Sequence, residues 1–527
     1  MEKLTTKDLL KNLKPNKDNK LSPQERAANA GRWIDERLGA AKGGRTFFNK
    51  IFPDHWSFML GEIALYSFVV LLVTGVFLSL YFDPSSTMLT YHGSYKPLDG
   101  TQVSAAYNST LAISFNVRFG LLVRQMHHWG ADIFLGAIAV HMCRIFFTGA
   151  FRKPREINWI VGVTLLILGI VNGFLGYSLP DDLISGTGLR IMFSVLESIP
   201  VVGTHLAFWL FGGNYPGNGA IIPRMYMLHI LVIPAIIAGL VGAHLFMLVR
   251  QKHTQFPGKG RTEHNVVGTP MWPGFMFKTQ GFLFLTVAVL ALLGGLAQIN
   301  PIWQYGQYFP YKVSYAVQPD WYMGWLDGAL RIMPSWEISA FGYMIPNQFF
   351  PSILFPGIAF NIFIIWPFLE ARMTKDRDIH NLLDRPRDRP KRTAVGTGAL
   401  AFFFMLFFAS STDVLANYLS VSLNLVLWFF RIATYVVPIV VALVTYKICI
   451  ELQLAGNNAG RRKRFNVVIR TEEGEYVAQK SPAREGDMDV LSEHGEIPLE
   501  LNDRVSHVIR QSADSIRVES KKSKTTT

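Results

Sequence analysis

Long hydrophobic runs separated by short polar connections dominate the chain. Eight runs are long enough to cross a hydrocarbon core about 30 Å thick, which takes roughly twenty apolar helical residues. They cover residues 58–82, 118–148, 158–179, 225–250, 278–298, 350–371, 394–413 and 424–451. Several contain Gly or Pro, which membrane helices tolerate when neighbouring groups satisfy the freed backbone. The pattern predicts an all-α integral membrane protein, an eight-helix transmembrane bundle, and makes a buried soluble core a poor alternative.

The polar connections alternate between rich and poor in Lys and Arg. Cations crowd residues 1–57 and the connections that follow the second, fourth and sixth runs. By contrast, Lys96 is the only cation between the first two runs before Arg118, and residues 414–423 have none. Because connections rich in Lys and Arg stay on the cytoplasmic side, both termini are predicted to be cytoplasmic.

Two hydrophobic runs each carry a pair of histidines. His127 and His141 are fourteen residues apart, and His229 and His244 are fifteen apart. At about 100° and 1.5 Å per residue, either spacing returns a side chain to within about 60° of one face, roughly 21 to 22 Å further along. Two such helices side by side would place one facing pair near each membrane surface. Facing imidazoles are the ligands of a six-coordinate haem iron, so we predict two non-covalent b haems.

Chain direction assigns the pairs. With the N-terminus inside, both histidine-bearing runs pass from outside to inside, so His127 and His229 are expected to bind an outer-side haem iron. His141 and His244 are expected to bind an inner-side haem iron. His128 points about 100° away from His127 and is not expected to be a ligand. A lone membrane histidine often only hydrogen-bonds a neighbouring helix, but two matched pairs make this structural reading weak.

Glycines on two other runs repeat the histidine spacing. Gly61 and Gly75 lie fourteen residues apart on the first run, and Gly162 and Gly176 fourteen apart on the third. Small residues let a flat macrocycle approach a helix backbone. The first four runs are therefore predicted to form a dihaem four-helix domain over residues 58–270, followed by a four-span domain over 271–455.

Three arginines flank the histidines. Arg124 and Arg224 precede His127 and His229 on the outer side, and Arg144 follows His141 on the inner side. Such arginines can pair with haem propionates. The alternative is interfacial snorkelling, which explains Arg144 equally well.

Composition narrows the function classes. The 527 residues carry a net charge of +13, which topology and attraction to anionic lipid explain better than nucleic-acid binding. Cys143 and Cys449 both lie inside hydrophobic runs, and no CxxCH motif exists, so neither a disulfide framework nor covalent haem attachment is indicated. No cleavable signal peptide is evident. Residues 456–527 form a polar cytoplasmic tail in which 467–470 and 476–477 are expected to be short strands.

Local motifs over about residues 45–450 resemble cytochrome b of the quinol–cytochrome c reductase (cytochrome bc) complexes. The motifs are Arg124-x-x-His127-x-x-Gly130-Ala131, His141-x-x-Arg144, Gly176-Tyr-x-Leu-Pro180, Ile199-Pro-x-x-Gly-Thr204 followed by Trp209 and Gly212-Gly213, Arg224-x4-His229, and Pro319-Asp320-Trp321-Tyr322. The last tetrapeptide stands where the family has its Pro-Glu-Trp-Tyr quinol-site signature.

The resemblance implies a translocating quinol–cytochrome c oxidoreductase subunit. Quinol would be oxidised near the outer haem with proton release outside. One electron would pass to a Rieske iron–sulfur partner and the other through both haems to an inner quinone site. Asp320 is the candidate proton acceptor, with Tyr322 positioning the quinol. Without the resemblance, Pro319-Asp320 reads as an ordinary turn.

Departures from the family pattern refine these expectations. Asp in place of Glu at 320 favours menaquinol as substrate. Asp181 and Asp182 replace part of the outer pocket and either join proton exit or cap the next segment. At the inner site, Lys278-Thr279 stands where mitochondrial members have Lys-Asp, so the candidate inner-site residues are His253, Glu263 and Lys278.

The long basic N-terminus and the extended tail resemble the actinobacterial form. This form implies a bacterial cell membrane, a homodimeric complex, a dihaem cytochrome c partner and a supercomplex with a terminal oxidase. Two alternatives stay open from the residues alone. One is a haem b membrane anchor of a dehydrogenase or hydrogenase, in which the Pro-Asp-Trp-Tyr loop has no task. The other is a secondary transporter with a histidine proton relay, which leaves the paired spacings unexplained.

Overall fold

The structure is a computed structural model that describes residues 22–312, 317–462, 466–470 and 476–480. Within these residues, eight helices are long and apolar enough to cross a membrane: Trp56–Ser79, Gly120–Phe147, Glu156–Tyr177, Ile221–Gln251, Met271–Leu296, Phe350–Thr374, Pro390–Ala409 and Leu423–Ala455. Each overlaps one predicted hydrophobic run, with ends that differ by a few residues. The predicted all-α, eight-span architecture is confirmed.

Four of the spans are single helices: α6 (Gly120–Phe147), α7 (Glu156–Tyr177), α16 (Pro390–Ala409) and α18 (Leu423–Arg462). The first span joins the 3-10 turn Trp56–Phe58 to α4 (Leu60–Ser79). The other three begin with or contain a π-helical segment: α10 (Ile221–Met227), Leu228–Val232 and α11 (Ile233–Gln251); Met271–Phe275 and α12 (Met276–Leu296); and Phe350–Leu354 and α15 (Phe355–Thr374).

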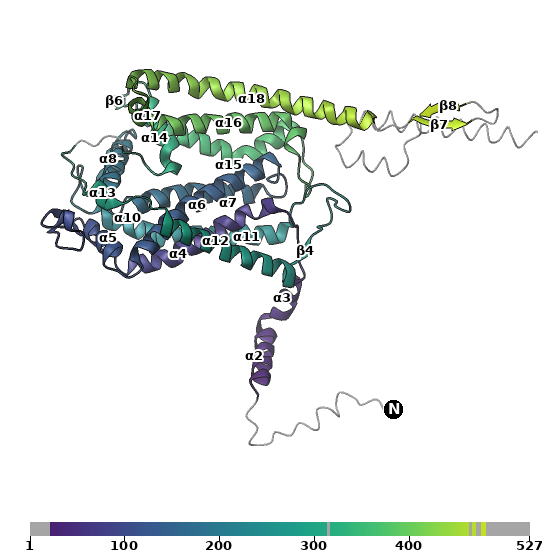
Figure 1. Ribbon diagram of the computed structural model, residues 1–527, viewed down its shortest axis with the longest axis horizontal. Helices are drawn as coiled ribbons and strands as arrows, with labels where there is room; N and C mark the ends of the chain where they lie inside the picture. Colours follow the sequence, from purple (N-terminus) through teal and green to yellow (C-terminus); the bar gives the residue numbers. More distant parts are fainter. Residues whose placement is uncertain (1–21, 313–316, 463–465, 471–475, 481–527) are drawn as a thin grey trace, which may run out of the picture.

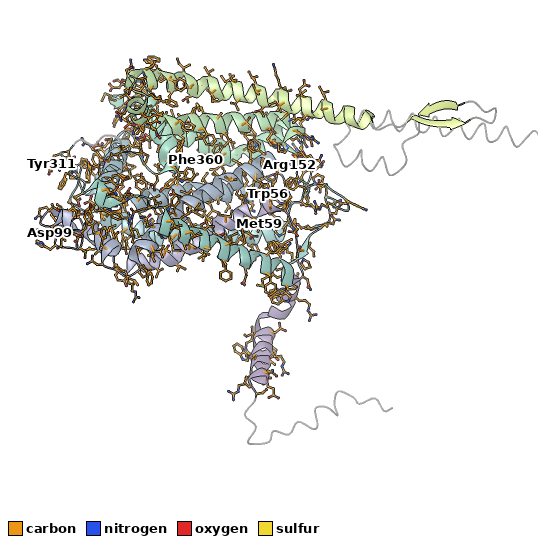
Figure 2. All side chains as sticks on the ribbon, in the orientation of Figure 1. Trp56, Met59, Asp99, Arg152, Tyr311 and Phe360 are labelled. Carbon is orange, nitrogen blue, oxygen red and sulfur yellow. The ribbon has the colours of Figure 1, made fainter. Side chains whose placement is uncertain are left out.

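The spans expose large apolar side chains rather than polar ones. Val73, Phe246 and Phe284 are each about two-thirds exposed (67%, 66% and 69%), and similar side chains project along the whole bundle (Figure 2). Such a surface is unfavourable in water but suits lipid, which is as apolar as the side chains themselves. The helices are therefore apolar all round, as expected of membrane spans.

The spans pack into two neighbouring groups (Figure 1). The largest buried apolar cluster joins α4, α6, α7 and α10–α11, and includes Phe68, Phe134, Leu175 and Ile237. α12 packs against α4 and α6. The second group is α16 with α18 and the short helix α14 (Gly324–Ile332), around Leu406 and Phe430. α15 packs against α7 and so links the groups.

The connections divide between the two ends of the bundle. Asp99 and Tyr311 lie at one end, and Arg152 lies at the other (Figure 2). The Asp99 end also carries α5 (Ala105–Phe115), α8 (Leu183–Glu197), α9 (Gly203–Phe211), α13 (Ile302–Tyr305), α14, α17 (Thr412–Leu419) and the 3-10 turns Lys96–Leu98 and Trp321–Met323. Two antiparallel strand pairs lie in these connections: β2 (Met88–Thr90) with β3 (Gln102–Ser104), and β5 (Ile338–Ala340) with β6 (Tyr343–Ile345).

The Arg152 end is tied together by buried arginines. Arg155 donates to the carbonyls of Lys252 and His380 at 3.0 and 2.7 Å, and to Asn381 Oδ1 at 2.7 Å, so it joins three connections. Arg392 pairs with Asp384 at 2.7 Å and with Glu370. This end also holds β1 (Ile51–Phe52) paired with β4 (Thr269–Pro270) and the 3-10 turn Pro386–Asp388.

The chain ends carry small elements outside the bundle. α2 (Pro23–Leu38) and α3 (Ala40–Phe48) precede the first span; Ser22 and Glu25 form a capping box at the start of α2. In the tail, β7 (Asn466–Arg470) pairs antiparallel with β8 (Tyr476–Lys480), which confirms the two predicted strands. The remainder of the tail lies outside the described residues.

Candidate functional site

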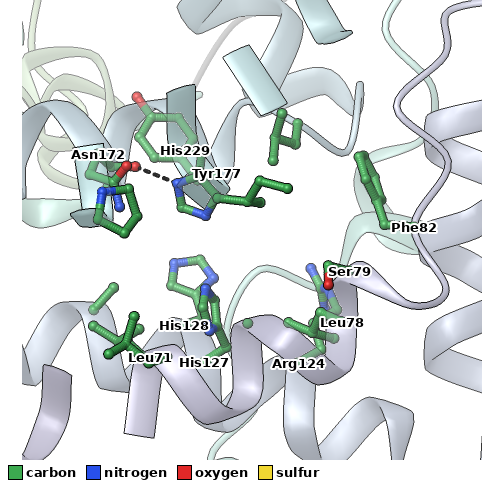
Figure 3. A pocket seen from close by; sticks show the side chains of 18 of the residues that line it. Leu71, Leu78, Ser79, Phe82, Arg124, His127, His128, Asn172, Tyr177 and His229 are labelled. Carbon is green, nitrogen blue, oxygen red and sulfur yellow. Dashed lines mark hydrogen bonds between the residues drawn. The ribbon is translucent and has the colours of Figure 1, made fainter. Parts of the chain in front are cut away.

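His127 and His229, the predicted outer pair, face each other across a gap between α6 and the fourth span (Figure 3). The ring centres of His127 and His229 lie 6.2 Å apart, with their planes at 79°. A metal–imidazole bond of about 2.0 to 2.1 Å on each side, plus about 1.1 Å from ring centre to nitrogen, would separate the centres by roughly 6.2 to 6.4 Å. The spacing therefore fits one metal ion between the two rings.

Hydrogen bonds orient both outer imidazoles. His229 Nδ1 lies 2.9 Å from the Asn172 carbonyl oxygen, to which it can only donate. His127 Nδ1 lies 2.9 Å from Thr74 Oγ1, whose own hydrogen goes to the Val70 carbonyl at 2.6 Å, so His127 Nδ1 donates as well. With Nδ1 protonated in both rings, Nε2 keeps its lone pair. This is the tautomer that a metal-binding histidine needs.

The π-helical segment Leu228–Val232 explains the fifteen-residue spacing of His229 and His244. Within it, the Ile233 amide donates to the Leu228 carbonyl, an i to i+5 bond that accommodates one extra residue in the turn. The extra residue absorbs the difference between fifteen and fourteen. The fourth span can therefore present its histidines on the same face as the second.

Glycines lie against the rings of all four histidines of the two pairs. A methyl group added at Gly176 would lie 2.5 Å from His229 Cε1, and one at Gly75 would lie 3.2 Å from His127 Cε1. At the inner end, a methyl group at Gly61 would lie 3.2 Å from His141 Cε1. The corresponding distance from Gly162 to His244 Cε1 is 3.8 Å. Each of the four predicted glycines therefore lies next to the ring of one predicted histidine.

The three arginines differ in their surroundings. Arg124 is buried, donates to the Asn300 carbonyl at 2.7 Å, and leaves its Nη1 without a partner among the described residues. Arg144 lies 4.3 Å over the Phe58 ring, and its Nε and Nη2 likewise lack partners there. Unpartnered guanidinium nitrogens suit an anionic group such as a propionate. Arg224 instead donates to the carbonyls of Trp209 and Leu210 of α9.

A cavity of about 300 Å³ opens beside the outer histidine pair. Its lining includes Gly75, Gly176, Arg124, His127 and His229. Asp320 and Tyr322 line the same cavity. Tyr322 is in the turn Trp321–Met323 and Asp320 directly precedes it, and both lie about 190 residues from His127 in the chain. The fold thus joins the predicted haem-binding and quinol-binding residues in one space.

Asp320 accepts two hydrogen bonds. Tyr322 Oη donates to Asp320 Oδ2 at 3.1 Å, and His128 Nε2 lies 2.9 Å from the same oxygen. Burial, with the Asp320 charge adding to it, raises the pKa of the Tyr322 phenol well above its usual range, so the phenol stays protonated and donates. A methyl group at Gly173 would lie 2.7 Å from Tyr322 Oη, so this glycine makes room for the phenol. The sequence gives no signal for a role of His128, because only the fold brings it to Asp320, 192 residues away.

The acidic pair that follows Pro180, Asp181 and Asp182, lies directly before the first residue of α8. Asp182 is fully buried and its side chain accepts from the Ser185 backbone amide, which caps α8. Asp181 accepts from Gln307 Nε2 at 2.7 Å, and burial raises the pKa of Asp181 to about 6. Asp182 therefore has the capping role, one of the two that the sequence allows.

The candidate residues for the inner quinone site are in separate environments. His253 is buried with its ring centre 4.4 Å from that of Phe52, and its Nε2 has no partner among the described residues. Glu263 accepts from the backbone amides of Asn381 and Leu382 and so holds a connection in place. Lys278 forms a half-exposed ion pair with Asp54 at 2.6 Å. No hydrogen bond or ion pair joins these three candidates in the described part of the chain.

Several known proteins are similar to this chain in sequence or in fold. A family model described as cytochrome b(N-terminal)/b6/petB matches residues 132–307. The cytochrome b subunit of the cytochrome bc1 complex from Corynebacterium diphtheriae is 51% identical over 426 residues, 81% of this chain and 78% of the relative. The corresponding subunits of Mycobacterium bovis and Streptomyces coelicolor are 49% and 46% identical, and cover 91% and 90% of this chain and 87% of each relative.

A solved structure supports the fold assignment. A chain of a hyperthermophilic respiratory Complex III aligns with a TM-score of 0.57 at 20% identity, over 79% of this chain and 99% of that chain. Eight apolar spans and relatives this similar over most of their length make the chain a multi-pass membrane protein. It belongs to the cytochrome b subunits of the cytochrome bc1 complex, a haem-binding family of respiratory electron transport.

Proposed function

We propose that the chain is the cytochrome b subunit of a menaquinol–cytochrome c reductase that carries electrons across a bacterial cell membrane. The cavity that joins the His127–His229 pair to Asp320 and Tyr322 is the observation that carries this proposal. It brings a proton acceptor and a metal-binding pair into one space, as quinol oxidation requires.

Two non-covalent b haems are the proposed cofactors of the histidine pairs. His127 and His229 would bind the outer-side haem iron, and His141 and His244 the inner-side haem iron. When bound, the haems supply one-electron redox chemistry that links the two sides of the membrane. Gly61, Gly75, Gly162 and Gly176 keep the space beside the rings open, and Arg124, Arg144 and Arg224 are the proposed partners of the propionates.

Asp320 acts at the outer site. Its carboxylate accepts a proton from the bound menaquinol and releases it to the outer side, while Tyr322 and His128 hold the carboxylate at the cavity wall. Oxidation of one quinol yields two protons and two electrons, and the second proton is also released to the outer side. One electron would pass to the Rieske subunit, and the haems that the histidine pairs would hold would supply the path of the other to the inner quinone site, as in a Q cycle. His253, Glu263 and Lys278 are the proposed residues of that inner site.

The proposed assembly is a homodimeric complex. It comprises this subunit, a Rieske iron–sulfur subunit and a dihaem cytochrome c, joined to a terminal oxidase and surrounded by membrane lipid, with no nucleic-acid partner. Both termini are cytoplasmic, which is supported by the basic residues gathered at the Arg152 end of the bundle.

A haem count with a redox titration of the complex tests the proposal. We expect two b-type haems per chain that titrate at separate potentials and are both reduced by menaquinol. One haem, no haem, or haems that menaquinol cannot reduce would overturn it.

A further inference from the structure

A carboxylate with no role in the proposed function lies at the start of α4. Glu62 is in the first turn of α4, directly after Gly61. A methyl group at Gly61 would lie 3.2 Å from His141 Cε1, so the residue before Glu62 lies close to that ring. Glu62 is therefore one residue along α4 from the glycine that lies against the His141 ring.

The Glu62 carboxylate is held by a hydrogen-bond network between α4 and α12. Thr279 Oγ1 donates to Glu62 Oε2 at 2.9 Å. Tyr66, one turn further along α4, hydrogen-bonds Thr279 Oγ1 and lies 3.5 Å from the same Glu62 oxygen. Among the described residues, none donates a hydrogen bond to Glu62 Oε1. One carboxylate oxygen is thus held by the protein, and the other has no protein donor among the described residues.

An ion pair at the inner surface lies beside this network. Lys278, adjacent to Thr279, pairs with Asp54 at 2.6 Å, and both side chains are at least half exposed. The Lys278 hydrogen bond lowers the pKa of Asp54, which therefore stays ionised. The pair is open to solvent and lies one residue from Thr279, the hydrogen-bond partner of Glu62.

An ionisable side chain inside a membrane span is costly and usually marks a functional site. A neutral amide would join α4 to α12 equally well, since Thr279 needs only an acceptor oxygen. The acidic group at position 62 is therefore explained by chemistry rather than by packing alone.

We propose that Glu62 is the proton donor of the inner quinone site, with Thr279 and Tyr66 as its positioning residues. This inference rests on the proposed function of the inner histidine pair. Reduction of one quinone to quinol takes two electrons, delivered through the inner haem, and two protons. Glu62 supplies one proton: its carboxyl O–H bond breaks and a bond to a quinone carbonyl oxygen forms. The other proton comes from cytoplasmic water, which also reprotonates Glu62.

The Glu62→Gln variant of the intact complex tests the inference. Gln keeps the acceptor oxygen for Thr279 but cannot supply a proton. Three quantities are measured: haem absorbance, reduction of the haems by menaquinol through the outer site, and reoxidation of the reduced inner haem by a short-chain menaquinone. We expect the first two to be unchanged and the third to slow by about tenfold to a hundredfold.

Two further variants sharpen the result. Glu156→Gln, at the inner end of α7, is the matched control and should leave all three quantities unchanged. Adding Thr279→Asp to Glu62→Gln returns a carboxylate from the opposite helix and should recover reoxidation. Unchanged reoxidation in Glu62→Gln overturns the inference. If the unaltered chain lacks haem or is not reduced by menaquinol, the proposed function itself is wrong.

If the Glu62→Gln complex does not assemble, the reoxidation rate of the Thr279→Val complex tests the inference instead. It leaves the carboxylate but removes the hydroxyl that fixes it, so reoxidation should slow by about fivefold, the effect of one lost hydrogen bond. Normal reoxidation in Thr279→Val would then overturn the inference.

Discussion

His128 Nε2 lies 2.9 Å from Asp320 Oδ2, so the histidine next to His127 in the chain contacts the carboxylate of the Pro-Asp-Trp-Tyr turn. The two adjacent histidines of α6 face different partners because successive helical residues point about 100° apart. His127 faces His229, and His128 faces the turn between the fifth and sixth spans. One helix thereby positions the proposed haem and the proposed proton acceptor relative to each other.

Asp320→Asn should reduce menaquinol oxidation by about a hundredfold, because the amide keeps the hydrogen bonds but cannot take a proton. The haem spectrum should not change. Steady-state turnover of the purified complex, with haem absorbance as the loading check, measures both. Asp99→Asn, an exposed carboxylate at the same end of the bundle, is the control and should behave as the unaltered protein. Full turnover in a haem-loaded Asp320→Asn complex would contradict the proposed role.

His128→Leu should lower kcat for menaquinol oxidation by about tenfold, because Asp320 loses the donor that orients it and a buried acceptor is left less satisfied. His128→Gln retains an N–H donor and should recover most of the activity. Comparison of kcat and KM for both variants, with the haem spectra recorded in parallel, separates orientation of Asp320 from damage to the adjacent His127. Equal activity in the two variants would argue against a hydrogen-bonding role.

Gly176→Ala should disturb the outer pair selectively. The added methyl group would lie 2.5 Å from His229 Cε1, closer than carbon atoms approach without displacement, so the ring must move. We expect loss of the outer-side haem, or a shift in its potential, with the inner-side haem retained. Gly239→Ala on α11 has no heavy atom within 4 Å of the added group and serves as the control. Two unaltered haem potentials in Gly176→Ala would exclude a close contact at this position.

His253 should make the protein sensitive to acid. Burial, reinforced by the charges of Lys50 and Arg155, lowers the pKa of His253 to about 4. Between the ordinary pKa near 6.5 and about 4, the unfolded chain binds more protons at this position than the folded chain, so stability falls as pH falls through this window. The full effect amounts to at most about 3 kcal/mol.

The His253→Gln variant cannot take up this proton. Its thermal unfolding midpoint, followed by haem absorbance at pH 7 and pH 5, should therefore decrease less on acidification than that of the unaltered complex. Equal decreases in the two proteins would show that other groups determine the acid sensitivity.

The membrane architecture follows from the sequence alone because hydrophobic length is a local property. Each of the eight predicted runs became a span, and His127 and His229, predicted to share one end of the bundle, face each other with ring centres 6.2 Å apart. Helical periodicity converts histidine spacings into faces without knowledge of the neighbours. The capping role of Asp182 is local in the same sense, since Ser185 lies three residues away.

Only the tertiary structure decided which distant groups meet. The π-helical segment at Leu228–Val232 brings a fifteen-residue spacing into register with a fourteen-residue one, and a plain helical count cannot reveal it. The contacts of Asp320 with His128 and of Glu62 with Thr279 join residues about 190 and 220 positions apart. Glu263 is occupied by the backbone of a distant connection for the same reason. Sequence periodicity determines the face on which a side chain lies, but packing determines what that face touches.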